Sequence, residues 1–203
     1  DYNGGDILDS VNILVYPRIN ADGSYKFQRN NVYANLNMNR GYLHMRSSEV
    51  QDVVSVYNAF RPHIVMDAHE WTPDNTGEKD SYFDDLWLFC NGSTNNSSSM
   101  LDDSIVLMEN VFADAGKVGI RPFFYVGNMN YDASEGTANS LAPYYYGLRG
   151  SYAFCVETRG IGIGRGCFER RVFSHYLTAE SMIRYAAANA EEVVTKVAAE
   201  RAR

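Results

Sequence analysis

One uninterrupted apolar run constrains the fold of this chain more than any other feature of the sequence. Residues 63–69 read HIVMDAH, and only apolar side chains lie between His63 and Asp67. A strand with one solvated face alternates apolar and polar residues, whereas a continuous apolar run is typical of a strand covered on both faces. The run therefore predicts a sheet with helices packed on both sides.

Segments of strand and helix character alternate along the rest of the chain. Apolar residues spaced three and four apart predict a helix from Ser47 to Phe60, with Ser47 as its N-cap. Further strands are expected at 11–16, 120–126 and 152–157, further helices at 100–116 and 171–203, a turn at 20–23, and loops at 72–82 and 91–99. This order predicts the α/β class, with a mostly parallel or mixed twisted sheet, in a single domain over residues 1–203.

Composition excludes two classes of partner. The chain has 203 residues and a formal net charge of −7, which disfavours nucleic acid because a phosphate backbone requires clustered Lys and Arg. No apolar run approaches the roughly 20 residues that a membrane-spanning helix needs. The three cysteines have no metal-binding or disulfide spacing, so they do not identify the cellular compartment. A secreted or periplasmic location is slightly favoured.

Two strand ends have side chains that are suited to chemistry. His69 and Glu70 close one predicted strand, and Glu157 closes another. Functional sites in α/β sheets collect outside the carboxyl ends of strands. On spacing alone a structural role is the commoner one for such a histidine, and Glu157 is equally explained by an ion pair with Arg159 or Arg165.

Motifs in the N-terminal third favour the functional alternative. PRINADGSYKFQRN is followed by NLNMNRGY, then by the strand ending in His69 and later by the strand ending in Glu157. This ordered set, over about residues 11–194, resembles the zinc metallocarboxypeptidases, typified by carboxypeptidases A and B. The resemblance implies a carboxypeptidase-like α/β fold, incomplete at its N-terminus, and a peptide substrate with a free C-terminal carboxylate.

The resemblance also implies a role for each matching residue. His69 corresponds to a zinc ligand and Glu157 to the general base that activates the attacking water. Arg29 corresponds to the arginine that stabilises the oxyanion, while Asn39 and Arg40 correspond to the pair that binds the terminal carboxylate of the substrate. All five residues suit the hydrolysis of a C-terminal peptide bond.

A tyrosine in a mobile loop closes over the substrate in this family. The stretch NYDASEGTANS matches that loop, which makes Tyr131 the expected catalytic and substrate-binding tyrosine. Tyr144, Tyr145 and Tyr146 in the nearby PYYYGLRG are competing candidates. For Asp67 and Glu70, which flank His69, a role in orienting the imidazole is expected of one or the other.

The chain departs from the family at the metal site. It contains no H-x-x-E motif, which supplies two of the zinc ligands in the family. Ala21 replaces the usual proline, and Asn37 stands where aspartate is common. We expect one Zn²⁺ with two ligands upstream of this chain, and a truncated chain that is inactive alone although its parent protein is an enzyme. Two alternatives are a metal-free module that binds peptide C-termini and an amidase-type relative acting on a non-protein amide such as a cell-wall peptide.

Overall fold

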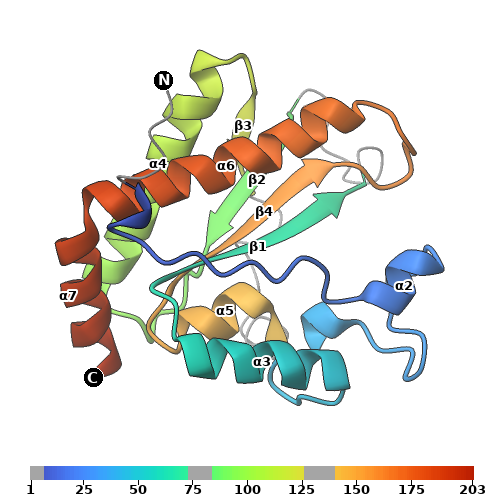
Figure 1. Ribbon diagram of the computed structural model, residues 1–203, viewed down its shortest axis with the longest axis horizontal. Coiled ribbons are helices and arrows are strands. Elements are labelled where there is room, and N and C mark those ends of the chain that lie inside the picture. The colour runs from blue at the N-terminus through green and yellow to red at the C-terminus, as the bar shows by residue number, and fades with distance from the viewer. Residues whose placement is uncertain (1–6, 73–83, 126–139) are drawn as a thin grey trace.

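The computed structural model describes residues 7–72, 84–125 and 140–203, and its centre is a four-stranded mixed sheet (Figure 1). The strands are β1 (Ile64–Trp71), β2 (Leu86–Cys90), β3 (Pro122–Phe124) and β4 (Tyr152–Arg159). Their order across the sheet is β1-β4-β2-β3. β1 is parallel to β4, β4 is antiparallel to β2, and β2 is parallel to β3. The predicted mixed sheet is therefore confirmed.

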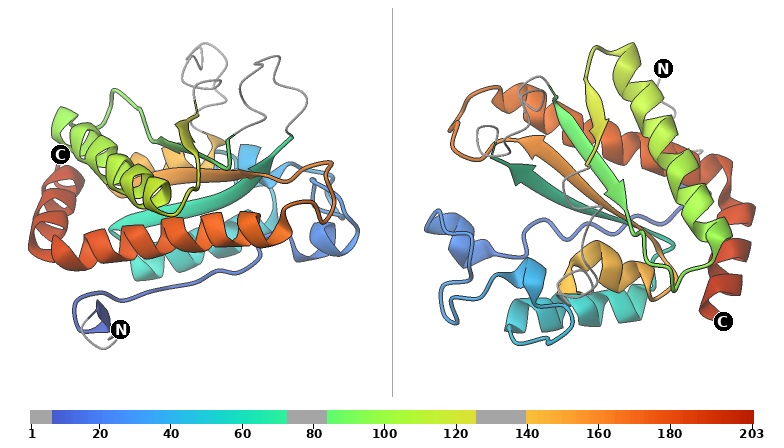
Figure 2. Two further views of the ribbon diagram at one scale, coloured as in Figure 1. Left: turned by 90° about the horizontal axis from the view of Figure 1, so that it is seen from above. Right: turned by 180° about the vertical axis from the view of Figure 1, so that it is seen from behind.

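Helices cover both faces of this sheet, as predicted. They are α2 (Ala21–Tyr25), the 3₁₀ helix η1 (Met38–Arg40), α3 (Ser48–Phe60), α4 (Ser98–Lys117), α5 (Ala142–Gly147), α6 (Phe168–Ala188) and α7 (Ala190–Arg201). In Figure 1 and in the right view of Figure 2, α3 and α5 lie below the sheet and α6 lies above it. None of the described helices is long and apolar enough to span a membrane.

Alternating side chains of the strands divide the core into two layers. Leu86, Leu88, Phe154 and Val156 are fully buried and pack with α4, α6 and α7. On the opposite face, Ala153 packs with α3, α5 and η1. Successive strand residues point to opposite faces, so residues 65, 67 and 69 of β1 share the second face with residues 153, 155 and 157 of β4. The predicted site residues of both strands therefore lie on one face.

The predicted helix at 47–60 is confirmed together with its cap. Ser47 Oγ accepts a hydrogen bond from the N–H of Val50 at 3.2 Å, which satisfies one of the free donors of the first turn. The helix ends at Arg61, whose backbone is left-handed with φ of 50° and whose N–H donates to the Tyr57 carbonyl at 2.7 Å. This end directs the chain into β1.

Two local predictions were wrong, and a third was two residues too long. Residues 11–16 form no strand, and Ile13, Leu14 and Val15 remain 47%, 48% and 72% exposed. An apolar run becomes a strand only when a partner accepts its ladder of hydrogen bonds, and no described strand pairs with this one. The turn predicted at 20–23 lies in the short helix α2, where the Asn20 side chain accepts from the N–H of Gly23. The predicted 91–99 loop gives way to α4 at Ser98.

Candidate active site

His69 and Glu157 lie side by side near the carboxyl ends of two parallel strands. The two residues are direct partners in the register of β1 and β4, so both side chains project from the same face. Trp87 of β2 is the partner of Glu157 on its other side. The register therefore places an imidazole, a carboxylate and an indole in one row across the sheet.

The His69 imidazole is oriented by a carboxylate from its own strand. Its Nε2 lies 2.6 Å from Asp67 Oδ2, and the two side chains are 29% and 13% exposed. The short distance to a carboxylate indicates that Nε2 holds the proton and donates it to Asp67. Asn39 Nδ2 also lies 3.1 Å from Nε2, but both nitrogens are donors in this tautomer, so the contact is no hydrogen bond; Asn39 is instead held by its Oδ1, which accepts from the N–H of Ala142 at 3.0 Å.

This arrangement suits a metal ligand. Within the described part of the chain, Nδ1 of His69 makes no hydrogen bond, while Nε2 is engaged by Asp67. Metal-binding histidines characteristically donate the ring N–H that does not bind the metal to a carboxylate or carbonyl. Nδ1 is therefore the atom through which His69 would coordinate. No group of three or more His, Cys, Asp or Glu side chains among the described residues could hold a metal, so a complete site needs further ligands from outside them.

The ionisable groups of the site influence one another. Burial lowers the pKa of His69, but the carboxylates of Asp67 and Glu157 together outweigh it, and the pKa is raised. Burial raises the pKa of Glu157, and the positive charges of His69 and Arg29 only partly oppose it. The charge of Arg29 lowers both pKa values, so this arginine is near enough to act on the pair electrostatically.

Arg29 and Arg40 lie in segments that precede β1. Arg29 is exposed on the loop after α2, where its carbonyl accepts a hydrogen bond from Asn20 Nδ2 at 3.0 Å. Arg40 ends η1, and its Nη1 donates to the Asn39 carbonyl at 2.8 Å. The buried thiol of Cys155 lies beside Glu157, with Sγ 3.8 Å from Oε1. Burial raises the pKa of this thiol, and the charge of Arg40 opposes that rise. Met38 of η1 packs on the face of the sheet that holds His69, and Arg40 ends that turn.

The candidate tyrosines fall into separate groups. Tyr131 lies outside the described residues. Tyr145 and Tyr146 are 8% and 4% exposed and belong to the core between α3 and the sheet, which does not suit a loop residue that closes over a ligand. Tyr144 lies on the same short helix, with its ring 6.4 Å from that of Phe89.

The two acidic neighbours of His69 have different environments. Asp67 contacts the imidazole, whereas Glu70 points to the opposite face and pairs with Arg171 of α6. The two-residue period of a strand is the signal that distinguishes them, because residues 67 and 69 share a face and residue 70 does not. His175 lies on α6, with its Nε2 3.2 Å from Thr158 Oγ1.

Sequence reasoning did not find the aromatic wall beside Glu157. The indoles of Trp71 and Trp87 stack with ring centroids 4.3 Å apart and planes 2° apart, and both side chains are buried. Tyr125 continues the stack at 5.2 Å from Trp87. The sequence signal was weak because the wall joins β1 to β2, and LWLFC is too short to reveal a strand by periodicity.

Known proteins resemble this chain in both sequence and fold. Probable carboxypeptidase 2 of Arthroderma benhamiae is 31% identical over 205 residues, which cover 94% of this chain and 38% of the relative. Carboxypeptidase 2 of Trichophyton rubrum is also 31% identical, over 94% of this chain and 37% of its own length. No family model matches the chain.

Solved structures show the same fold. A metallo-carboxypeptidase from Pseudomonas aeruginosa in complex with (2-guanidinoethylmercapto)succinic acid superposes with a TM-score of 0.63 at 18% identity, over 87% of this chain and 45% of that one. One from Burkholderia cenocepacia gives a TM-score of 0.56 at 17% identity, over 85% and 42%. This chain thus spans less than half the length of each of these proteins. The chain is thus similar in sequence to the carboxypeptidases 2 and shares its fold with the metallo-carboxypeptidases.

Proposed function

We propose that the protein acts as a zinc-dependent carboxypeptidase that removes C-terminal residues from peptides. The observation that supports this most strongly is the pairing of His69 with Glu157 in the register of β1 and β4, with Asp67 holding Nε2 of the imidazole. The names of the sequence relatives point to the same activity.

Zn²⁺ is the metal that best fits the donor chemistry. A neutral imidazole nitrogen is a preferred zinc ligand, and His69 would contribute Nδ1 to a site completed by ligands outside the described residues. When bound, zinc supplies Lewis acidity that lowers the pKa of a coordinated water to about 7.

Glu157 is positioned to act as the general base. Its carboxylate lies beside His69 on the same face of the sheet and is half-buried against Cys155. Partial burial raises its pKa, which brings it nearer to that of the water whose proton it takes. Glu157 then donates this proton to the leaving amine, and Arg29 provides positive charge for the developing oxyanion.

Arg40 and Asn39 provide the contacts that restrict cleavage to a chain end. The guanidinium of Arg40 is exposed and offers paired donors that match a carboxylate. Asn39 is held by its Oδ1, which accepts from the N–H of Ala142, and its amide nitrogen offers N–H donors to the substrate. A terminal carboxylate at this point would place the last peptide bond near Glu157.

The experiment uses the full-length protein, with zinc content measured and peptides offered in pairs that differ only in a free or amidated C-terminus. We expect release of the terminal residue from the free form alone. Glu157→Gln should reduce kcat by about 10²- to 10⁴-fold while peptide binding persists, because a general base contributes about that factor. Glu109→Gln, an exposed change on α4, is the matched control.

Two results would contradict the proposal. Equal cleavage of amidated peptides would exclude recognition of the terminal carboxylate and favour an amidase-type reaction. Zinc-free protein that binds peptide C-termini without cleaving them would indicate a binding module.

A further inference from the structure

A polar cavity lies at the amino ends of β1 and β4, away from the candidate active site. Its volume is about 580 Å³, within the range of small-molecule sites. Arg61 lies three residues before β1, and Arg149 and Gly150 lie just before β4. His69 is near the other end of β1, so the rise per strand residue separates the two sites by roughly 20 Å.

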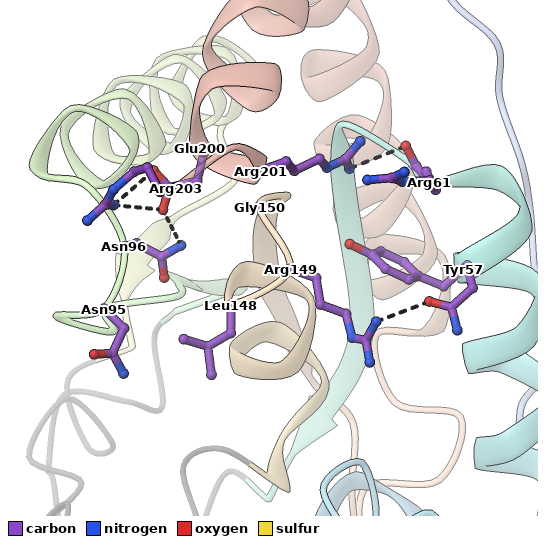
Figure 3. Close-up of a pocket in the computed structure, with 11 residues that line it drawn as sticks. Tyr57, Arg61, Asn95, Asn96, Leu148, Arg149, Gly150, Glu200, Arg201 and Arg203 are labelled. Carbon is purple, nitrogen blue, oxygen red and sulfur yellow. Dashed lines mark hydrogen bonds and ion pairs between the residues drawn. The ribbon is translucent and has the colours of Figure 1, made fainter.

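Arginine side chains dominate the lining of this cavity. The lining includes four arginines, Arg61, Arg149, Arg201 and Arg203, and one acidic residue, Glu200, which leaves an excess of three positive charges (Figure 3). The chain as a whole has a net charge of −7, so this concentration of positive charge runs against its composition. Such a local excess attracts anions.

Glu200 does not neutralise the cluster. Its side chain is 6% exposed, and it accepts hydrogen bonds from the N–H of Ser97 at 3.1 Å and from Asn96 Nδ2 at 3.0 Å. Its ion pair is with Arg203, at 3.1 Å. The carboxylate is thus occupied by the first turn of α4 and by one arginine.

The other three guanidinium groups form no ion pair with a carboxylate in the described parts of the chain. Arg201 Nη2 donates to the Pro62 carbonyl at 2.9 Å, and its buried Nε has no hydrogen-bond partner among those residues. Arg149 lies over the Tyr145 ring at 4.5 Å and donates to Asn58 at 3.3 Å. These partners are neutral and leave the positive charges uncompensated.

The backbone is shaped to hold Arg201 in this place. Gly150 has φ of 77°, and a Cβ there would lie 2.6 Å from Arg201 Cγ. Only glycine allows both this conformation and the close approach of the arginine. The charge of Arg201 also reaches His63, whose pKa is lowered by burial and then by that arginine.

We propose that this cavity binds a small oxyanion with two or more negative charges, such as phosphate, a phosphate monoester, or a di- or tricarboxylate. Guanidinium groups recognise both kinds of ligand through paired N–H donors. A multivalent anion would compensate the excess charge that the protein leaves unpaired. The inference is independent of the peptidase activity, because the cavity shares no residue with the candidate active site.

The test is calorimetric titration of inorganic phosphate and, separately, citrate into the protein in a phosphate-free buffer at low ionic strength. We expect one site for at least one of the two, and their relative affinities distinguish a phosphate site from a polycarboxylate site. Arg61→Gln and Arg149→Gln should each weaken binding by about 10-fold or more, since a hydrogen bond to a charged group contributes about 1.5–3 kcal/mol. Arg165→Gln, which removes an exposed arginine elsewhere, should leave the affinity unchanged.

Thermal melts of each variant identify any that fails to fold, and Arg61, exposed at the end of α3, remains informative if Arg149→Gln unfolds the protein. The proposal is overturned if phosphate and citrate both bind no better than acetate. It is also overturned if Arg165→Gln weakens binding as much as the cavity variants do.

Discussion

Asp85 is the buried carboxylate whose removal should have the largest effect on stability. Its side chain is 2% exposed and accepts hydrogen bonds from Arg170 Nε at 2.7 Å and Arg170 Nη2 at 2.6 Å. Arg159 lies 3.4 Å away, and the N–H of Arg121 donates to Oδ2 at 3.0 Å. The residue thus joins α6, β4 and the segment before β3 at the start of β2.

Asp85→Asn keeps the shape but removes the charge, leaving two guanidinium groups without their carboxylate. Breaking a buried ion pair costs about 3–5 kcal/mol. Arg170 is 41% exposed, so solvent screens part of its charge and we expect about 3 kcal/mol. In a chain of this size that corresponds to a fall in Tm of about 6–12 °C.

The pH dependence provides a second readout. Burial raises the pKa of Asp85, but the hydrogen bonds from Arg170 and from the Arg121 N–H outweigh it, and the pKa is lowered. A carboxyl group with a lowered folded-state pKa stabilises the fold above its unfolded pKa of about 3.9 and loses that contribution as the pH falls through the folded value.

Urea denaturation at pH 7 and at acidic pH measures both effects. The free energy of unfolding of the wild-type protein should exceed that of Asp85→Asn at pH 7, and this difference should shrink as the pH falls below about 4. A difference in free energy of unfolding of less than about 1 kcal/mol at pH 7, or one that does not shrink in acid, would contradict this prediction. It would mean that Asp85 and Arg170 contribute no more than an ordinary surface ion pair.

Two further substitutions test the candidate site and the fold around it. Asp67→Asn should weaken zinc binding by about 10- to 100-fold in a metal titration of the full-length protein, because the Asp67 carboxylate orients His69. Glu70→Gln, on the opposite face of the sheet, should leave the zinc affinity unchanged. Equal effects of the two substitutions would contradict the assigned orientation of the side chains. Ser47→Ala should lower the free energy of unfolding by about 1 kcal/mol in urea denaturation, since it removes the cap of α3, and an unchanged value would mean that water replaces the cap.

The sequence predicted correctly those helices and strands that have a recognisable period, cap or apolar run within their own residues. The helix at 47–60 has both a period and a cap, and the strands that include Val65 and Phe154 are continuous apolar runs. β2 was not predicted because five buried residues have no readable period. Residues 11–16 have the same apolar character, yet no described strand pairs with them, since a run of side chains does not specify its partner.

The candidate site was predictable in its residue types more than in its contacts. The pairing of His69 with Glu157 depends on a register between strands more than 80 residues apart, which no local pattern contains. The choice of Asp67 over Glu70 was readable from strand alternation. The position of Asn39 beside the imidazole depends on the 3₁₀ helix η1, and a helix of three residues has no sequence pattern from which it could be predicted.

The most direct test of the account is a crystal structure of the zinc-loaded full-length protein with anomalous diffraction at the zinc edge. We predict an anomalous peak about 2.0–2.1 Å from Nδ1 of His69, the usual zinc–nitrogen distance, on the face that holds Glu157. A peak that has no contact with His69, or coordination through Nε2 with Asp67 displaced, would contradict the central claim that this strand end supplies a metal ligand.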